Sequence, residues 1–206
     1  MEFERRLPER LVATGGLVLR RWIPDDAALV ARAVEESLEH LRPWMSWVAQ
    51  EPLSLARRTA LIEEWERGWA QGGDVVMGVF LRGRVAGGCG LHHGIGHDGL
   101  ELGYWTHARF LRRGIATAAA ALLTDAAFAL PGITHVEIHH DKANRASAGV
   151  PRRLCYQLIG EVPDEPEAPA EIGMECQWRL TKQEWARRAA RRRREASPLR
   201  RRSDRA

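Results

Sequence analysis

Cysteine is scarce in this 206-residue chain, and the placement of the few cysteines argues against two kinds of site. The chain contains three, Cys89, Cys155 and Cys176, which lie far apart and form no C-x-x-C pair. An odd number at such spacing supports neither a disulfide framework nor a structural zinc site. We therefore interpret the three residues as buried thiols.

Long apolar runs are also missing. The first ten residues, MEFERRLPER, are charged from the second residue onward and lack the apolar core of a signal peptide. No apolar run reaches the roughly 18 residues that a membrane-spanning helix needs. We expect a cytoplasmic protein without a membrane partner, and the 45% hydrophobic content suits a single domain with a sizeable core.

Acidic residues are few at the C-terminal end, where basic residues accumulate. Residues 181–206 contain 11 Lys and Arg against 3 Asp and Glu, a net charge of +8, whereas the rest contains 20 against 24, a net charge of −4. Self-repulsion and the lack of apolar residues soon after Trp185 predict a domain over residues 1–181 and a flexible Arg-rich tail over residues 182–206. The tail is either solvated and partly helical, without a dedicated partner, or in salt-sensitive contact with rRNA or another polyanion. Base stacking is unsupported, because no aromatic residue lies among the tail arginines.

Neighbouring histidines do not favour a metal site. His92 lies next to His93, and His139 lies next to His140. Adjacent residues of a strand point to opposite faces of the sheet, so neither pair can easily hold one ion. We expect no metal.

The first half of the chain alternates between helical and strand patterns. Helices are expected over residues 25–38 and 53–70. Strands are expected over residues 17–23, 75–81, 85–91 and 100–106. The segment Arg82-Gly-Arg84 forms a hairpin turn between two of these strands, so the last three strands should form an antiparallel meander.

The stretch HARFLRRGIATAAAALL looks like a loop that opens a helix. Gly114 follows two arginines and precedes an alanine-rich run of high helix propensity, so a helix should begin near it and extend to about residue 130. The first amides of a helix lack intrahelical partners, and the helix dipole places about half a positive charge at that end. With Arg112 and Arg113 beside it, this helix end predicts a diphosphate site. A strand over residues 135–140 should then pair in parallel with the strand over residues 100–106.

The segments HLRPWMSW, ELGYW, RRGIAT and NRAS, in that order, resemble the acetyl-CoA-dependent N-acetyltransferases of the GNAT superfamily. The resemblance covers about residues 15–181 and is nearest to the branch of ribosomal-protein N-terminal acetyltransferases. The family's pyrophosphate loop has the pattern (Gln/Arg)-x-x-Gly-x-(Gly/Ala), which residues 111–116 match except at Leu111, whose side chain cannot donate a hydrogen bond. The implied fold class is α/β (α+β): one GNAT-like domain with a mixed, mostly antiparallel sheet, a splayed pair of parallel strands and flanking helices.

The resemblance also implies that acetyl-CoA is the cosubstrate and that its pantetheine arm lies between the splayed strands. Ligands of open sheets bind at the carboxyl ends of strands, here the end of the strand over residues 100–106. The cofactor-binding residues are then predicted to be Trp105, Thr106, His107, Arg112, Arg113, Gly114, Ile115, Ala116, Thr117 and Asn144.

Glu101 is the candidate base that deprotonates the acceptor amine. It shares a strand face with Gly103 and Trp105, and a carboxylate among apolar neighbours can accept a proton directly or through water. The alternative is an exposed strand glutamate or a structural ion pair. The resemblance favours the role of base, because many relatives carry a carboxylate at this place.

Ser147 is the candidate proton donor to the departing thiolate, as the resemblance implies. Capping of the last helix is the alternative role for Asn144, since asparagine is a favoured N-cap. Many superfamily members use a tyrosine seven residues after this asparagine, where the present chain has Pro151. Pro151 also lacks the N–H that would bond the Ser147 carbonyl, so the helix should kink or loosen there.

Trp44 and Trp47 follow Pro43 in an irregular connection, where a core or a ligand must cover them. The branch resemblance places this region beside the acceptor pocket, and core packing is the alternative. The acidic tract over residues 161–171 should be a surface loop before a last strand over residues 173–180, or else border the acceptor entrance.

These features predict an N-acetyltransferase that moves an acetyl group directly from acetyl-CoA to a primary amine in a ternary complex. A protein or peptide N-terminal amine is the leading acceptor. The first alternative is a small amine such as an antibiotic or polyamine, and the second is a non-catalytic CoA-binding or ribosome-associated module. Whether the protein is a monomer or a homodimer stays open.

Overall fold

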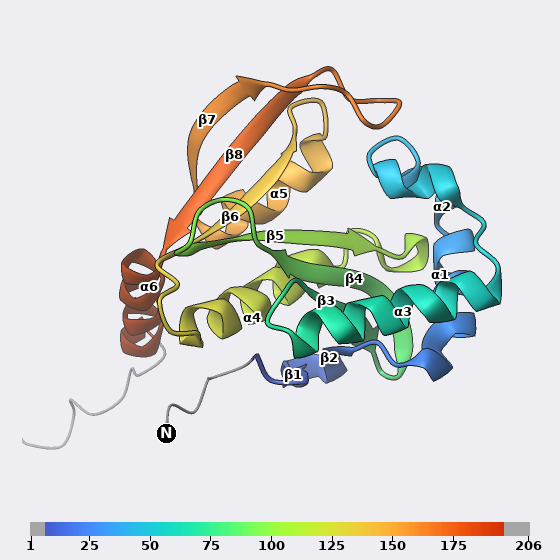
Figure 1. Ribbon diagram of the computed structural model, residues 1–206. Coiled ribbons are helices and arrows are strands. Elements are labelled where there is room, and N and C mark those ends of the chain that lie inside the picture. The colour runs from blue at the N-terminus through green and yellow to red at the C-terminus, as the bar shows by residue number, and fades with distance from the viewer. Residues whose placement is uncertain (1–6, 196–206) are drawn as a thin grey trace, which may run out of the picture.

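The structure, a computed structural model, describes residues 7–195 and is built on one eight-stranded sheet (Figure 1). The strands are β1 (Arg10–Val12), β2 (Leu17–Arg21), β3 (Val75–Leu81), β4 (Arg84–His92), β5 (Gly99–Thr106), β6 (His135–Asp141), β7 (Gln157–Pro163) and β8 (Met174–Thr181). Their order across the sheet is β1-β2-β3-β4-β5-β6-β8-β7. Neighbouring strands pair antiparallel, except that β5 and β6 run parallel.

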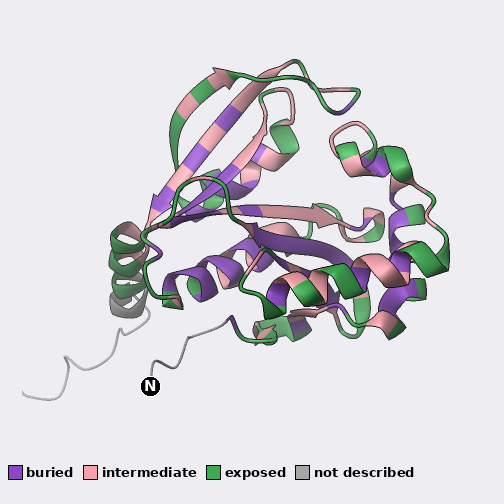
Figure 2. Cartoon of the chain, in the orientation of Figure 1, coloured by how far each residue is buried: buried purple, intermediate pink, exposed green. Residues whose placement is uncertain are grey.

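Helices cover both faces of the sheet. They are α1 (Ala27–Glu35), α2 (Leu38–Leu41), α3 (Leu55–Ala70), α4 (Ile115–Ala129), α5 (Arg145–Leu154) and α6 (Lys182–Glu195). On one face, α4 buries Ala119, Ala120 and Leu123 in the main apolar core. On the other face, α1 and α3 form a second cluster around Trp22 and Phe80. Figure 2 shows that β4, which lies between these two layers, is almost entirely buried.

The parallel strands β5 and β6 separate soon after they pair. Their ladder contains only the pairs Gly99 with His135, Leu100 with Val136 and Glu101 with Glu137. β5 continues to Thr106 and β6 to Asp141, and Figure 1 shows the two strands diverging. The predicted fold, with its splayed parallel pair and flanking helices, is therefore confirmed.

Two local predictions were right only in part. The acidic tract was expected to be a loop from residue 161, but β7 extends to Pro163 and pairs with β8. β7 lies at the edge of the sheet and exposes most of its side chains, so it lacks the apolar alternation that marks a half-buried strand. Cys89 and Cys176 are buried as expected, whereas Cys155 is exposed at the end of α5, where its φ of 62° lies in the left-handed region.

The region after residue 181 also differs from the expected flexible tail. Residues 182–195 form α6, which lies beside α4 in Figure 1, and its Trp185 packs against the main core and donates a hydrogen bond to Asp125. Thr181 and Glu184 form a capping box, because the Thr181 amide donates to Glu184 at 2.9 Å and the Glu184 amide donates to Thr181 Oγ1 at 3.3 Å. The packed part of the chain thus continues past residue 181, and residues 196–206 lie outside the described residues. Among residues 7–195, no helix is both long and apolar enough to cross a bilayer.

Candidate functional site

A cavity of about 500 Å³ lies where the end of β5 meets the first turns of α4 and α5, and we call it the α4–α5 cavity. Most of the predicted cofactor residues line it, and so do one predicted catalytic residue and one predicted acceptor residue. These are Trp105, Thr106, Arg112, Gly114, Ile115, Ala116, Thr117, Asn144, Ser147 and Trp44. The cavity therefore brings together residues from distant parts of the chain, from Trp44 to Ser147.

The first turn of α4 presents free amides to this cavity. Gly114 is the N-cap residue, and no side chain accepts a hydrogen bond from the first turn. The first hydrogen bond back to Gly114 comes from the Ala118 amide at 2.9 Å, so the preceding amides have no partner within the helix. Gly114 has φ 73°, and a Cβ there would meet no heavy atom within 4 Å, so glycine is favoured by backbone conformation and not by crowding.

Two predicted cofactor residues do not line the α4–α5 cavity. The Arg113 guanidinium lies over the Phe110 ring, 5.7 Å from its centroid. His107 is buried, and its Nδ1 accepts a hydrogen bond from the Arg109 amide at 3.1 Å. Burial lowers the pKa of His107, although the nearby Glu36 carboxylate opposes this change. His107 thus caps the turn at Ala108–Phe110, just before the loop that leads into α4.

Ser147 is held by contacts from two directions. Its amide donates to Asn144 Oδ1 at 3.0 Å, so Asn144 caps α5 while also lining the cavity. The Tyr104 hydroxyl lies 2.9 Å from Ser147 Oγ and donates to the Ser147 carbonyl at 3.1 Å. That carbonyl would normally accept from residue 151, but Pro151 has no N–H. Burial raises the pKa of Tyr104 to about 12, so its hydroxyl stays protonated at neutral pH.

A second cavity, of about 460 Å³, lies on the α1 and α3 side of the sheet. Four tryptophans line it, and we call it the tryptophan cavity: Trp22, Trp47, Trp65 and Trp105. Gly88, Gly90 and Gly103 of the sheet also line it, and so do Met45 and Leu61. Of the two predicted acceptor residues, Trp47 therefore lines this cavity, whereas Trp44 lines the α4–α5 cavity.

An ion pair lies within the wall of the tryptophan cavity. The side chains of Glu51 and Arg58 are 5% and 4% exposed, and Arg58 Nη2 donates to Glu51 Oε1. Glu51 also accepts from the Leu53 amide at 2.9 Å. Within residues 7–191, whose side chains the structure describes, Arg58 Nε is buried and finds no hydrogen-bond partner. Sequence reasoning missed this pair, because it depends on how the connection before α3 folds back.

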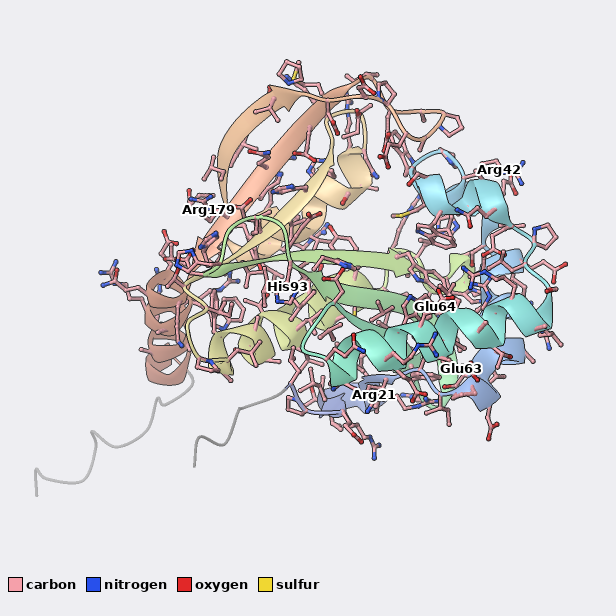
Figure 3. All side chains as sticks on the ribbon, in the orientation of Figure 1. Arg21, Arg42, Glu63, Glu64, His93 and Arg179 are labelled. Atoms are coloured by element: carbon pink, nitrogen blue, oxygen red, sulfur yellow. The ribbon has the colours of Figure 1, made fainter. Side chains whose placement is uncertain are left out.

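Glu101 lines neither cavity. Its carboxylate lies 3.9 Å from His139 Nδ1, and the other ring nitrogen of His139 is 2.6 Å from Glu137. Glu137 is buried and pairs with Arg179, which projects from β8 in Figure 3. The neighbours of Glu101 are thus polar and not apolar as expected, and its role as base stays a prediction. Among the described residues, no group of three or more His, Cys, Asp and Glu side chains is placed to hold a metal ion.

Comparison with known proteins identifies the relatives of this chain. The chain is 26% identical over 149 residues to YdaF of Bacillus subtilis (strain 168), a protein named as a ribosomal N-acetyltransferase; the match covers 72% of this chain and 81% of YdaF. RimJ of Mycobacterium smegmatis, solved with a CoA disulfide, has a TM-score of 0.77 at 22% identity, covering 94% of this chain and 95% of that one. RimL, a ribosomal L7/L12 alpha-N-protein acetyltransferase solved with CoA, has a TM-score of 0.78 at 17% identity, covering 85% and 99%.

The two solved structures share the fold of this chain. The family model described as an acetyltransferase (GNAT) domain matches residues 16–157, which is more than half of the sequence. The chain therefore belongs to the GNAT acetyltransferase family.

Proposed function

We propose that this protein is an N-acetyltransferase that transfers an acetyl group directly from acetyl-CoA to a primary amine. The observation that carries the proposal is the α4–α5 cavity, in which the free amides of the first turn of α4 face a space at the splay of β5 and β6. Amides at a helix N-terminus bind phosphate groups, and Arg112 adds positive charge beside them. The CoA complexes of RimJ and RimL support the same cosubstrate.

The residues of this chain can hold each part of such a cosubstrate. The amides of Ile115, Ala116 and Thr117 bind the diphosphate, and the small side chain of Ala116 leaves the backbone accessible. Leu111 offers no side-chain donor, so the contacts at that place come from the backbone and from Arg112. Asn144 and Thr106 lie beside the pantetheine arm. When bound, acetyl-CoA supplies an activated acetyl thioester.

Acetyl transfer needs two proton transfers, and we assign one to Ser147 and the other to Glu101. The acceptor nitrogen bonds to the acetyl carbon, the bond from that carbon to sulfur breaks, and the nitrogen loses a proton. Ser147 lines the cavity and donates a proton to the departing sulfur, then regains one from solvent. Glu101 accepts the amine proton through water, because its carboxylate lies outside the lining of both cavities.

A protein or peptide N-terminal amine is the proposed acceptor. The names of YdaF, a ribosomal N-acetyltransferase, and of RimL, a ribosomal L7/L12 alpha-N-protein acetyltransferase, support an acceptor of this kind. The cytoplasmic location stays a prediction. A small-molecule amine is the first alternative, and a CoA-binding module without turnover is the second.

Mass spectrometry of amines incubated with the protein and acetyl-CoA tests the proposal. A mixed panel of N-terminal peptides and small amines should yield at least one product that has gained an acetyl group, and free CoA should appear in equal amount. Release of CoA without an acetylated amine, or no reaction with any amine despite CoA binding, would contradict acetyl transfer and favour the non-catalytic module.

A further inference from the structure

The tryptophan cavity has the size and the walls of a site for an apolar group. Its volume of about 460 Å³ lies in the range of roughly 300–1,000 Å³ that ligand pockets have. Most of its wall is indole and aliphatic carbon, so water in it would find few hydrogen-bond partners. Apolar pockets with a few placed polar groups are typical of ligand sites.

The charges around this cavity do not attract a cation. Glu51 is neutralised by Arg58, and the remaining charged group of the lining, Arg57, donates to Glu64 at 2.8 Å. Figure 3 shows Glu64 on α3. His92 also lines the cavity and contacts Asp74 at 2.9 Å. A polyamine needs carboxylates that are free to pair with each ammonium group. The lining provides no such carboxylate, because Glu51 is its only acidic residue.

Arg58 does not offer a polar contact to a bound group. Its Nε–H has no partner among the described side chains, but it is buried away from the cavity, so a group in the cavity does not reach it. The Glu51 carboxylate neutralises its guanidinium. The recognition that this lining offers is therefore mainly apolar.

The tryptophan cavity adjoins the α4–α5 cavity. Met45, Tyr104 and Trp105 line both, and the Trp47 and Trp105 rings lie 6.3 Å apart at an interplanar angle of 59°. A group held among the tryptophans can therefore direct a short substituent past Trp105 toward Ser147. This is the path that an amine needs to reach the acetyl group.

We infer that the tryptophan cavity binds the body of the acceptor, and that the acceptor is a primary amine joined to a bulky aromatic or apolar group. For a peptide acceptor, this means a large apolar or aromatic first residue. The inference rests on the proposed acetyl transfer and names its substrate class. It excludes polyamines and small first residues as good acceptors.

Binding of amino-acid amides in the presence of CoA tests this class without requiring turnover. Phenylalaninamide should bind with a Kd about tenfold or more below that of alaninamide, because burial of its ring removes apolar area from water. Spermidine should bind no better than alaninamide. Equal Kd values for the three amines, or tighter binding of spermidine, would overturn the inference.

A substitution that fills the cavity provides the structural control. Leu61→Trp should weaken phenylalaninamide binding by about tenfold and leave the Kd of acetyl-CoA unchanged, since Leu61 lines only the tryptophan cavity. The matched variant Leu55→Trp adds the same ring to the same helix at a residue that is 57% exposed and lines neither cavity, so it should bind like the native protein. Unchanged phenylalaninamide binding in Leu61→Trp would show that the site lies elsewhere.

Turnover measurements test the acceptor class separately from acetyl transfer itself. Selective binding of phenylalaninamide that depends on Leu61, but without an acetylated product, would support the cavity assignment and contradict acetyl transfer. A kcat/KM for alaninamide equal to that for phenylalaninamide would leave acetyl transfer standing and overturn the acceptor class.

Discussion

At the scale of single residues, Pro151 changes which group bonds the Ser147 carbonyl. The Tyr104 hydroxyl takes the place of the missing helical amide and also contacts Ser147 Oγ. A side chain with one fixed hydrogen-bond partner samples fewer rotamers, so Tyr104 is suited to hold the Ser147 hydroxyl at the edge of the cavity. The contact joins residues 43 positions apart, so no sequence pattern could reveal it.

Variants of Tyr104 and Ser147 test whether the two act together. Ser147→Ala should lower kcat by roughly ten- to a hundredfold with little change in CoA affinity, because it removes the proton donor. Tyr104→Phe should lower kcat by up to about tenfold in the native protein and have little further effect in Ser147→Ala, since it acts through Ser147. Steady-state kinetics of both single variants and the double variant measure this. Fully multiplicative losses would contradict coupling, and loss of CoA affinity in Ser147→Ala would make Ser147 a cofactor contact.

Glu101 and Glu175 both approach His139, but only Glu101 is the proposed base. Glu101→Gln should depress turnover most at low pH, where the free amine is scarce, and the loss should shrink toward about pH 8, the ordinary pKa of a peptide α-amine. Glu175→Gln serves as the matched control and should keep the native pH profile. If the native protein, Glu101→Gln and Glu175→Gln had parallel pH–rate profiles, Glu101 would have a structural role and would not be the base.

At the scale of elements, β6 and β8 are joined by a histidine that must stay neutral. Trp178 Nε1 donates to His140 Nε2 at 3.0 Å, and His140 Nδ1 lies 2.8 Å from the Asp141 carbonyl. A neutral ring with its proton on Nδ1 satisfies both contacts. Burial lowers the pKa of His140, and the nearby Arg152 lowers it further, while Asp141 and Glu175 oppose the change.

The free energy of unfolding should therefore fall as the pH drops below about 6.5, the ordinary pKa of histidine. Protonation is less favourable in the folded protein, so the unfolded chain binds more protons in this range and is stabilised relative to the folded state. Denaturant titrations between about pH 7 and 5 should show a shallower dependence for His140→Asn than for the native protein. His97→Asn, at an exposed histidine, should keep the native slope. If the unfolding free energy of His140→Asn depended on pH as steeply as that of the native protein, His140 would not be the source of this pH dependence.

At the scale of the whole molecule, the elements that sequence predicted well are those with strong local chemistry. The alanine run of α4, the meander of β3 to β5 and the parallel β5–β6 pair lie where propensity, turns and loop length place them. β7 was missed because an exposed edge strand carries no apolar alternation. The basic tail was expected to be solvated and partly helical. The packing of its first part was not expected, because the arginine run obscured the Thr181–Glu184 capping box and the docking of Trp185.

The site was predictable where it consists of backbone and unpredictable where it depends on side-chain direction. The α4 N-terminus was located from Gly114 and the arginines before it. His107 and Arg113 belong to the same loop, but one points into the protein and the other stacks on Phe110. The buried Glu51–Arg58 pair depends on how the connection before α3 folds back, which no local pattern specifies. Contact of the basic C-terminal region with rRNA or another polyanion stays a prediction.

The measurement that most directly tests the central claim compares how much acetyl-CoA raises the melting temperature of the native protein and of two glycine variants. Gly114 and Gly132 both have positive φ, 73° and 79°, and a Cβ at either would meet no heavy atom within 4 Å, so glutamate should strain the backbone similarly at both. Only Gly114 lies at the α4 N-terminus, where the new carboxylate would occupy the anion site.

At about 100 times its Kd, acetyl-CoA should stabilise the native protein by about 2.7 kcal/mol, a rise of about 5–10 °C in Tm for a domain of this size. Gly132→Glu should show the same rise, and Gly114→Glu should show none. An undiminished rise in Gly114→Glu, or no rise in the native protein, would contradict the assignment of the α4 N-terminus as the acetyl-CoA site.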